Sequence, residues 1–170
     1  MRMLSNFLII LLAAYLFLVL LVYWVQSHLV YFPDKQLSNT PGVFGLEYTS
    51  ISIPTSDGET LHGWWVPVAD SKGTVLLFHG NAGNISHRIN YLTMFSKLGY
   101  NTLLLDYRGY GQSSGKPSES GTYLDAQAAW RYLTETKGIA PEHIVLFGES
   151  LGGAVAAWLA DTSLDGIYAS

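Results

Sequence analysis

Two stretches of the sequence carry a serine between two glycines in the spacing G-x-S-x-G, which is typical of a nucleophilic serine on a sharp turn. One is GESLG at residues 148–152, and the other is GQSSG at residues 111–115. Ser150 follows a short apolar run and precedes small and apolar residues, as expected for a strand entering the turn and a helix leaving it. Ser113 lies inside a glycine- and serine-rich loop. The sequence therefore predicts Ser150 as the nucleophile of an acyl transfer.

Two N–H groups that could bind the oxyanion of such a reaction follow from the same pattern. A helix that starts after Ser150 leaves its first N–H groups without intrahelical partners, which predicts Leu151 N–H as one donor. The second donor is expected in HGNAGN at residues 79–84, where Asn81 is predicted and Ala82 is the reserve. The alternative for both segments is an ordinary turn between a strand and a helix that takes no part in catalysis. A phosphate-binding loop is disfavoured because neither G-x-G-x-x-G nor G-x-x-x-x-G-K-[ST] occurs there.

A general base for the serine is harder to find. No histidine follows Ser150, and the later acids are Asp161 and Asp165. His79 has the best position among the earlier histidines, but we expect it to brace the loop at residues 79–84, which is predicted to supply the second oxyanion donor. The remaining histidines are expected to be structural or solvated: His28, His62, His87 and His143.

The segment DYRGYG at residues 106–111 follows an expected strand and opens a long loop. Asp106 and Arg108 in this segment could form an acid–base pair. We expect instead that they support the loop after their strand.

The order of the remaining elements indicates an α/β domain. Strand-like residues 48–54 and 61–68 flank the turn sequence SDGE, which predicts an antiparallel hairpin. Short apolar runs then alternate with helical stretches, which predicts a parallel sheet of buried strands covered on both faces. Gly99 is expected to end the first helix, and Thr122 with Asp125 is expected to form a capping box at the second. Strands are expected at 74–78, 101–105 and 144–147, helices at 86–98, 122–137 and 151–160, and the start of another strand at 166–169.

An uncharged apolar run, FLIILLAAYLFLVLLVYWV at residues 7–25, precedes these elements. As a helix it would be about 28 Å long, close to the ~30 Å hydrocarbon core of a bilayer, so a transmembrane helix is predicted. A cleaved signal peptide is disfavoured because the run is long for a signal core and no small-x-small site follows. Arg2 is the one charged residue before the run, which favours an N-terminus in the cytoplasm and the domain outside it.

These features divide the chain and bound its partners. We expect a membrane anchor at residues 1–27, a connector at 28–47 and a partial domain at 48–170. The net charge of −4 provides no basic surface for nucleic acid. The absence of cysteine excludes disulfides and thiolate metal sites. The expected partners are a membrane, through residues 7–25, and a small-molecule acyl substrate, with no metal and no organic cofactor.

Three motifs in this order resemble the α/β-hydrolase superfamily: HGNAGN at 79–84, DYRGYG at 106–111 and GESLGG at 148–153. The likeness is greatest to the membrane-anchored Bem46-like and serine aminopeptidase-like hydrolases, which have elements similar to YFP at 31–33 and LHGW at 61–64. The resemblance implies an α/β-hydrolase fold, in which a hairpin precedes parallel strands alternating with helices. It also implies hydrolysis of an ester, thioester or amide through an acyl-serine, with a triad in the order Ser, Asp or Glu, His.

No histidine follows Ser150, and Asp165 comes at the start of an expected strand, too early for the acid of that triad. We therefore expect a C-terminally truncated hydrolase domain, its N-terminal two-thirds, that is inactive or nearly so. One alternative is a degenerate or truncated non-catalytic membrane protein with at most a binding role. Another is that a second chain supplies the missing strands and the histidine.

Overall fold

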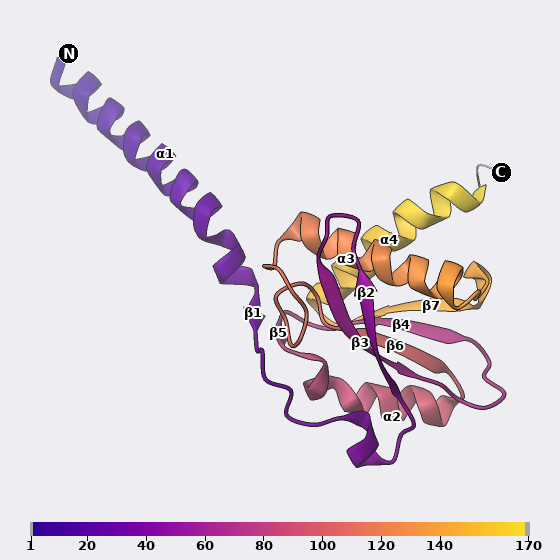
Figure 1. Cartoon of the computed structure of the whole chain (residues 1–170). Coiled ribbons are helices and arrows are strands. Elements are labelled where there is room, and N and C mark those ends of the chain that lie inside the picture. The colour runs from indigo at the N-terminus through magenta and orange to yellow at the C-terminus, as the bar shows by residue number, and fades with distance from the viewer. Residues whose placement is uncertain (1, 169–170) are drawn as a thin grey trace. The chain divides into compact units, whose positions relative to one another are not determined.

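The computed structural model describes residues 2–168 and divides into two compact units, Met1–Tyr31 and Phe32–Ser170. The first unit is one α-helix, α1 (Arg2–Val30), with no buried residue (Figure 1). An 18-residue window of α1 has a mean hydropathy of 2.8, so the helix is long and apolar enough to cross a membrane. Signal sequences share these properties, so α1 is a candidate membrane span.

The second unit is built on a mixed sheet of five strands in the order β2-β3-β6-β4-β7. The predicted hairpin is present, because β2 (Thr49–Pro54) pairs antiparallel with β3 (Thr60–Val66). The central strand β4 (Thr74–Phe78) pairs in parallel with β6 (Asn101–Leu105) and β7 (Ile144–Gly148). Strands therefore exist at the three predicted positions, and β6 joins them to the hairpin through an antiparallel pairing with β3.

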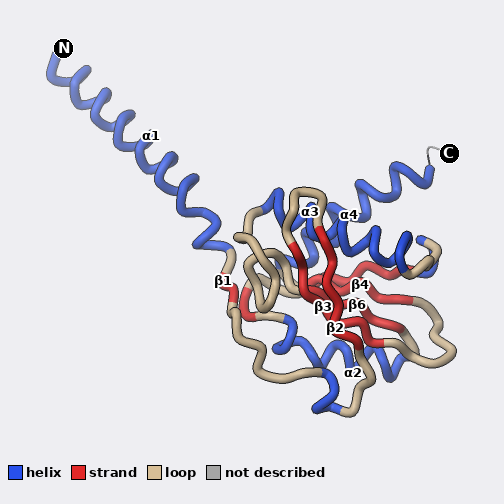
Figure 2. The backbone as a smooth tube through the Cα atoms, viewed as in Figure 1, coloured by secondary structure: helices blue, strands red, loops and turns tan. Residues whose placement is uncertain are grey.

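Helices cover both faces of the sheet (Figures 1 and 2). On one face lies α2 (Ile89–Leu98), preceded by the 3₁₀ turn η2 (Ile85–Arg88), and Gly99 ends α2 as predicted. On the other face lie α3 (Glu119–Arg131) and α4 (Leu151–Tyr168). The core beneath α2 is apolar and includes buried Trp64, Val75, Leu77, Leu92 and Leu104.

The predicted start of the helix after the long loop is wrong. The α3 helix begins at Glu119, because the side chain of Ser118 caps it by accepting a hydrogen bond from Gly121 N–H at 3.1 Å. Thr122 instead donates its hydroxyl proton to Glu119 O at 2.8 Å, and Asp125 is engaged elsewhere. A π-helical turn, η3 (Tyr132–Thr136), continues α3 close to the predicted end.

The strand predicted at residues 166–169 is also wrong over 166–168, which belong to α4, and Ala169 lies outside the described residues. A short apolar run has no periodicity that distinguishes a strand from a helix, and here the helix continues through it.

The segment expected as a connector is part of the second unit from Phe32 onward. The short strand β1 (Phe32–Pro33) pairs in parallel with β5 (Ala82–Gly83), and a 3₁₀ turn, η1 (Pro41–Phe44), follows it. Residues just after the anchor are thus hydrogen-bonded to the loop in which an oxyanion donor is predicted.

The outer strand β7 is less buried than its neighbours. Every residue of β4 is buried, whereas Val145 in β7 is 49% exposed. Within residues 2–168, β7 pairs with β4 and with no strand on its other side. The prediction that this strand is buried on both faces is therefore wrong for the described part of the chain, and an apolar sheet edge is open.

Candidate active site at a strand–helix turn

Ser150 occupies the turn between β7 and α4, which is the strand–turn–helix setting expected from the sequence. Its φ is +52°, in the left-handed region that non-glycine residues rarely adopt. Hydrogen bonds hold the turn in this shape: Glu149 N–H donates to Phe78 O at 3.0 Å, and Gly152 N–H donates to Glu149 O at 2.8 Å. The serine is exposed, so this backbone presents its hydroxyl at the surface of the second unit.

The two glycines of the motif are required by close backbone packing. A methyl group on Gly148 would overlap the carbonyl oxygen of Gly152, and one on Gly152 would overlap the carbonyl oxygen of Phe78. The next glycine is different, because a methyl group on Gly153 would lie 3.8 Å from its nearest neighbour, Gly148 O. Close packing of the helix against the sheet therefore depends on Gly148 and Gly152.

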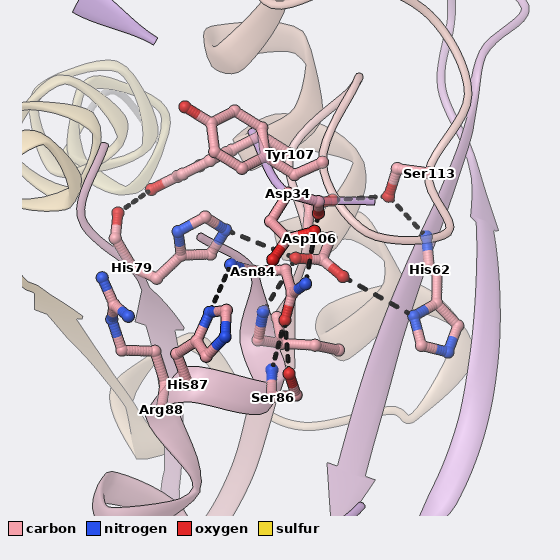
Figure 3. Close-up of polar contacts among 12 residues, drawn as sticks. Asp34, His62, His79, Asn84, Ser86, His87, Arg88, Asp106, Tyr107 and Ser113 are labelled. Atoms are coloured by element: carbon pink, nitrogen blue, oxygen red, sulfur yellow. Dashed lines mark hydrogen bonds and ion pairs between the residues drawn. The ribbon is translucent and has the colours of Figure 1, made fainter. Parts of the chain in front are cut away.

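The serine of the second G-x-S-x-G stretch has a different environment. Ser113 is buried, its hydroxyl donates to Asp106 O at 2.8 Å, and it accepts a hydrogen bond from His62 N–H at 2.9 Å (Figure 3). His62 lies within β3 and Asp106 directly follows β6, so this hydroxyl ties the long loop to the sheet. The geometry favours Ser150 over Ser113 as a nucleophile.

Leu151 is the first residue of α4, so its N–H lies at the open end of the helix, where no intrahelical acceptor exists. The N–H next to the serine is thus available to a developing negative charge, and the helix dipole adds to the attraction.

The orientation of the loop at residues 79–84 follows from its carbonyl groups. His79 Nδ1 lies 2.7 Å from Gly80 O, and because a carbonyl can only accept, Nδ1 carries the proton. Asn81 O accepts hydrogen bonds from Phe32 N–H at 2.9 Å and from the Tyr110 hydroxyl at 2.6 Å. In a trans peptide the N–H points opposite to the preceding carbonyl. His79 therefore orients Asn81 N–H, and the pair Phe32 and Tyr110 orients the N–H of the next residue, Ala82.

His79 is fully buried against the ring of Tyr107, at a centroid distance of 4.5 Å, and its carbonyl accepts a hydrogen bond from the Tyr107 hydroxyl at 3.0 Å (Figure 3). Burial lowers the pKa of His79, which favours the neutral ring. Its Nε2 faces Asp106 Oδ1 at 3.6 Å. These contacts support the expected bracing role.

Asp106 is buried between two imidazoles and supports the start of η2. Its Oδ1 accepts a hydrogen bond from Ile85 N–H at 2.9 Å, and its Oδ2 lies 3.8 Å from His62 Nδ1 (Figure 3). Its own N–H donates to His62 O at 2.9 Å. The carboxylate therefore connects the hairpin, the loop after β4 and the loop after β6.

Arg108 does not pair with Asp106. Its Nε donates to Asp125 Oδ1 at 2.8 Å, and its Nη1 donates to Asp57 Oδ2 at 2.7 Å. The hydrogen bond from Arg108 lowers the pKa of Asp57, which stays ionised in acid. Arg108 thus links the hairpin turn, its own loop and α3, as expected for a loop-supporting residue.

Sequence reasoning missed a pair of charged residues beside the serine. Arg88 Nε donates to Glu149 Oε2 at 2.6 Å, and Arg88 Nη2 donates to Ala82 O at 3.1 Å. A signal was present, because Glu149 is the one charged residue in the otherwise apolar and small stretch around Ser150.

No imidazole of the described residues is hydrogen-bonded to the Ser150 hydroxyl. His62 Nε2 lies 2.9 Å from the Ser50 hydroxyl, and His87 Nδ1 accepts a hydrogen bond from Asn84 N–H at 3.2 Å. Across residues 2–168, no cluster of three or more His, Asp or Glu side chains could hold a metal ion.

Comparison with known proteins gives a consistent picture. Residues 73–166 match the model of the family described as alpha/beta hydrolase fold. The chain is 42% identical over 152 residues to the alpha/beta hydrolase domain-containing protein WAV2 of Arabidopsis thaliana, covering 85% of the chain and 49% of WAV2. It is 40% identical over 157 residues to protein bem46 of Schizosaccharomyces pombe, covering 87% of the chain and 52% of bem46. The chain thus spans about half the length of the curated relatives it matches.

Solved structures show the same likeness. An esterase of Pyrococcus furiosus superimposes with a TM-score of 0.65 at 29% identity, covering 76% of this chain and 51% of that one. An alpha-beta hydrolase of Vibrio vulnificus has a TM-score of 0.62 at 30% identity, covering 71% and 43% of the two chains.

Proposed function

Because the chain belongs to the alpha/beta hydrolase fold family, we propose that it carries the nucleophile half of a serine hydrolase active site. The observation that supports this most strongly is the backbone of Ser150, which is held at a φ of +52° at the open end of α4. Strain of this kind is maintained where function needs it. The reaction proposed is hydrolysis of an ester, thioester or amide.

In this mechanism Ser150 Oγ attacks the substrate carbonyl carbon, and its proton passes to a general base. The carbonyl oxygen becomes an oxyanion that accepts hydrogen bonds from Leu151 N–H and Asn81 N–H. Collapse of this intermediate breaks the bond to the leaving group, which takes the proton from the base. Water then attacks the acyl-serine by the same route, which releases the acid and restores the serine.

We further propose that the base and its orienting acid come from polypeptide outside these 170 residues. No described imidazole is hydrogen-bonded to the Ser150 hydroxyl, and the relatives are about twice as long as the chain. The open edge of β7, with Val145 exposed, is a suitable place for further strands to pair. The 170-residue chain alone is then nearly inactive.

A fluorophosphonate probe tests this proposal. We define the extended chain as residues 1–170 followed by the segment that comes after the matched region of bem46. We expect the probe to modify Ser150 in the extended chain about 10²- to 10⁴-fold faster than in the chain alone, because a general base contributes that factor. Peptide mass spectrometry identifies the modified residue.

Two outcomes would count against the proposal. Modification at Ser113 would assign the chemistry to the other motif. A folded extended chain, judged by circular dichroism, that reacts no faster than the chain alone would favour a non-catalytic membrane protein with a binding role.

We also propose that residues 7–25 span a membrane, with the N-terminus in the cytoplasm and the domain outside it. The chain should stay with membranes during alkaline extraction. The double substitution Leu12→Lys and Leu16→Lys, near the centre of the run, should release it, because each central lysine costs about 3 kcal/mol of insertion free energy. Leu29→Lys, near the end of α1, is the matched control and should remain membrane-bound.

Protease digestion of intact cells tests the proposed orientation of the chain. A domain that is protected from the protease would overturn that orientation.

A further inference from the structure

One ion pair connects the loop at residues 79–84, the oxyanion loop, with the turn that carries the serine. Glu149 directly precedes Ser150, and its carboxylate accepts a hydrogen bond from Arg88 Nε at 2.6 Å. The same guanidinium donates through Nη2 to Ala82 O at 3.1 Å. Arg88 therefore uses two of its nitrogens to join two segments that are far apart in the sequence.

The backbone of the oxyanion loop also lies against this pair. A methyl group on Gly80 would be 3.5 Å from Arg88 Nη2 and 3.5 Å from Glu149 Oε1. Both side chains are largely covered, with exposed fractions of 15% for Arg88 and 32% for Glu149. Such an ion pair is less screened than one on the open surface, and its planar donor fixes direction as well as distance.

The other carbonyls of the loop are held by different groups. Gly80 O is bound by His79, and Asn81 O is bound by Phe32 and Tyr110. The bond from His79 lies within the loop, and the two bonds to Asn81 O tie the loop to β1 and to the loop after β6. The bond from Arg88 to Ala82 O differs because its guanidinium also holds the residue next to the serine.

We propose that Arg88 and Glu149 are positioning residues that hold the oxyanion loop at a fixed separation from Ser150. The inference rests on the hydrolase function proposed above. An oxyanion hole works when its donors lie within hydrogen-bonding distance of the developing oxyanion, and a displacement of 1 Å costs about 10²-fold in rate. The ion pair sets that separation, because one of its partners binds the loop and the other adjoins the nucleophile.

The test uses Arg88→Gln and Glu149→Gln, with Arg88→Lys as a conservative variant. Arg131→Gln is the matched control, because Arg131 is exposed on α3 and forms no ion pair with a described residue. In the 170-residue chain in detergent, hydrogen exchange at residues 79–84 should become about fivefold faster in the Gln variants. In the extended chain, probe modification of Ser150 should slow about 10- to 100-fold. For Arg88→Lys, both the exchange rate and the modification rate should lie between those of the native chain and the Gln variants. Lysine keeps the charge, but its ammonium group does not hold two acceptors in fixed directions as a guanidinium does.

The two readouts separate this inference from the proposed function. One outcome is faster hydrogen exchange in the Gln variants together with no probe modification of Ser150 in the unsubstituted extended chain. This outcome would support the role of Arg88 and Glu149 in holding the loop, and it would reject the hydrolase function. A reactive Ser150 whose rate and loop exchange are unchanged in both Gln variants would overturn the inference. So would a loss of rate that matches a loss of folded protein on thermal unfolding, because a merely structural role predicts that result.

Discussion

Replacing Ser150 with alanine should lower ester hydrolysis by the extended chain by about 10⁴- to 10⁶-fold, the loss that follows when a catalytic serine is removed. The residual rate would come from the oxyanion donors, which remain in place. Turnover of p-nitrophenyl acetate measures the effect. The fold should be intact, because the Ser150 side chain is exposed and forms no hydrogen bond with a described residue.

Ser113→Ala is the control, because the chain offers a second serine in the same spacing. Its hydroxyl binds Asp106 O and His62 N–H, so the change should cost about 1–3 kcal/mol of stability and leave turnover nearly unchanged. If Ser113→Ala abolished turnover of a folded protein and Ser150→Ala did not, the assignment of the nucleophile would be wrong.

Gly152→Ala should have the largest effect on stability, a loss of at least about 4 kcal/mol in the free energy of unfolding. The added methyl group would overlap Phe78 O and lie 2.8 Å from His79 O. Both obstacles are backbone atoms, so no rotamer change relieves them, and either β4 or the start of α4 must move. Urea unfolding of the 170-residue chain in detergent, followed by circular dichroism, measures the loss of stability.

Gly153→Ala is the matched control one residue along the helix. Its methyl group would meet Gly148 O at an ordinary 3.8 Å, so the substitution should be neutral or gain up to about 1 kcal/mol from helix propensity. An equal loss in both variants would show that the helix itself, and not its contact with β4, is sensitive to substitution.

Much of this fold could be predicted from local sequence, because each element carries its own boundaries. The run NTLLL follows the helix-ending Gly99, and the structure has β6 over those residues. The hairpin likewise follows from alternation around a turn. Failures came where two local signals competed or where pairing is long-range. Ser118 caps α3 in place of Thr122, and β1 pairs with β5 across fifty residues of chain, which no local pattern reveals.

In the candidate site, too, the features marked by local sequence were predictable and the long-range contacts were not. The setting of Ser150 and the position of the loop at 79–84 were predictable, because both depend on strand ends that the sequence marks. The side chains that hold the loop were less so. Tyr110 binds the carbonyl of Asn81, 29 residues earlier in the sequence, and Arg88 joins Ala82 O to Glu149, 61 residues after the arginine. Backbone carbonyls carry no sequence signature, and only the folded chain shows which donor reaches them.

The left-handed backbone at residue 150 also limits which nucleophile evolution can place there. Threonine offers the same hydroxyl, but its branched Cβ is poorly tolerated at a φ of +52°. Cysteine has an unbranched Cβ and fits the turn as serine does. The turn therefore accepts an exchange of oxygen for sulfur more readily than the addition of one methyl group, so its geometry restricts the chemical variation open to descendants of this chain.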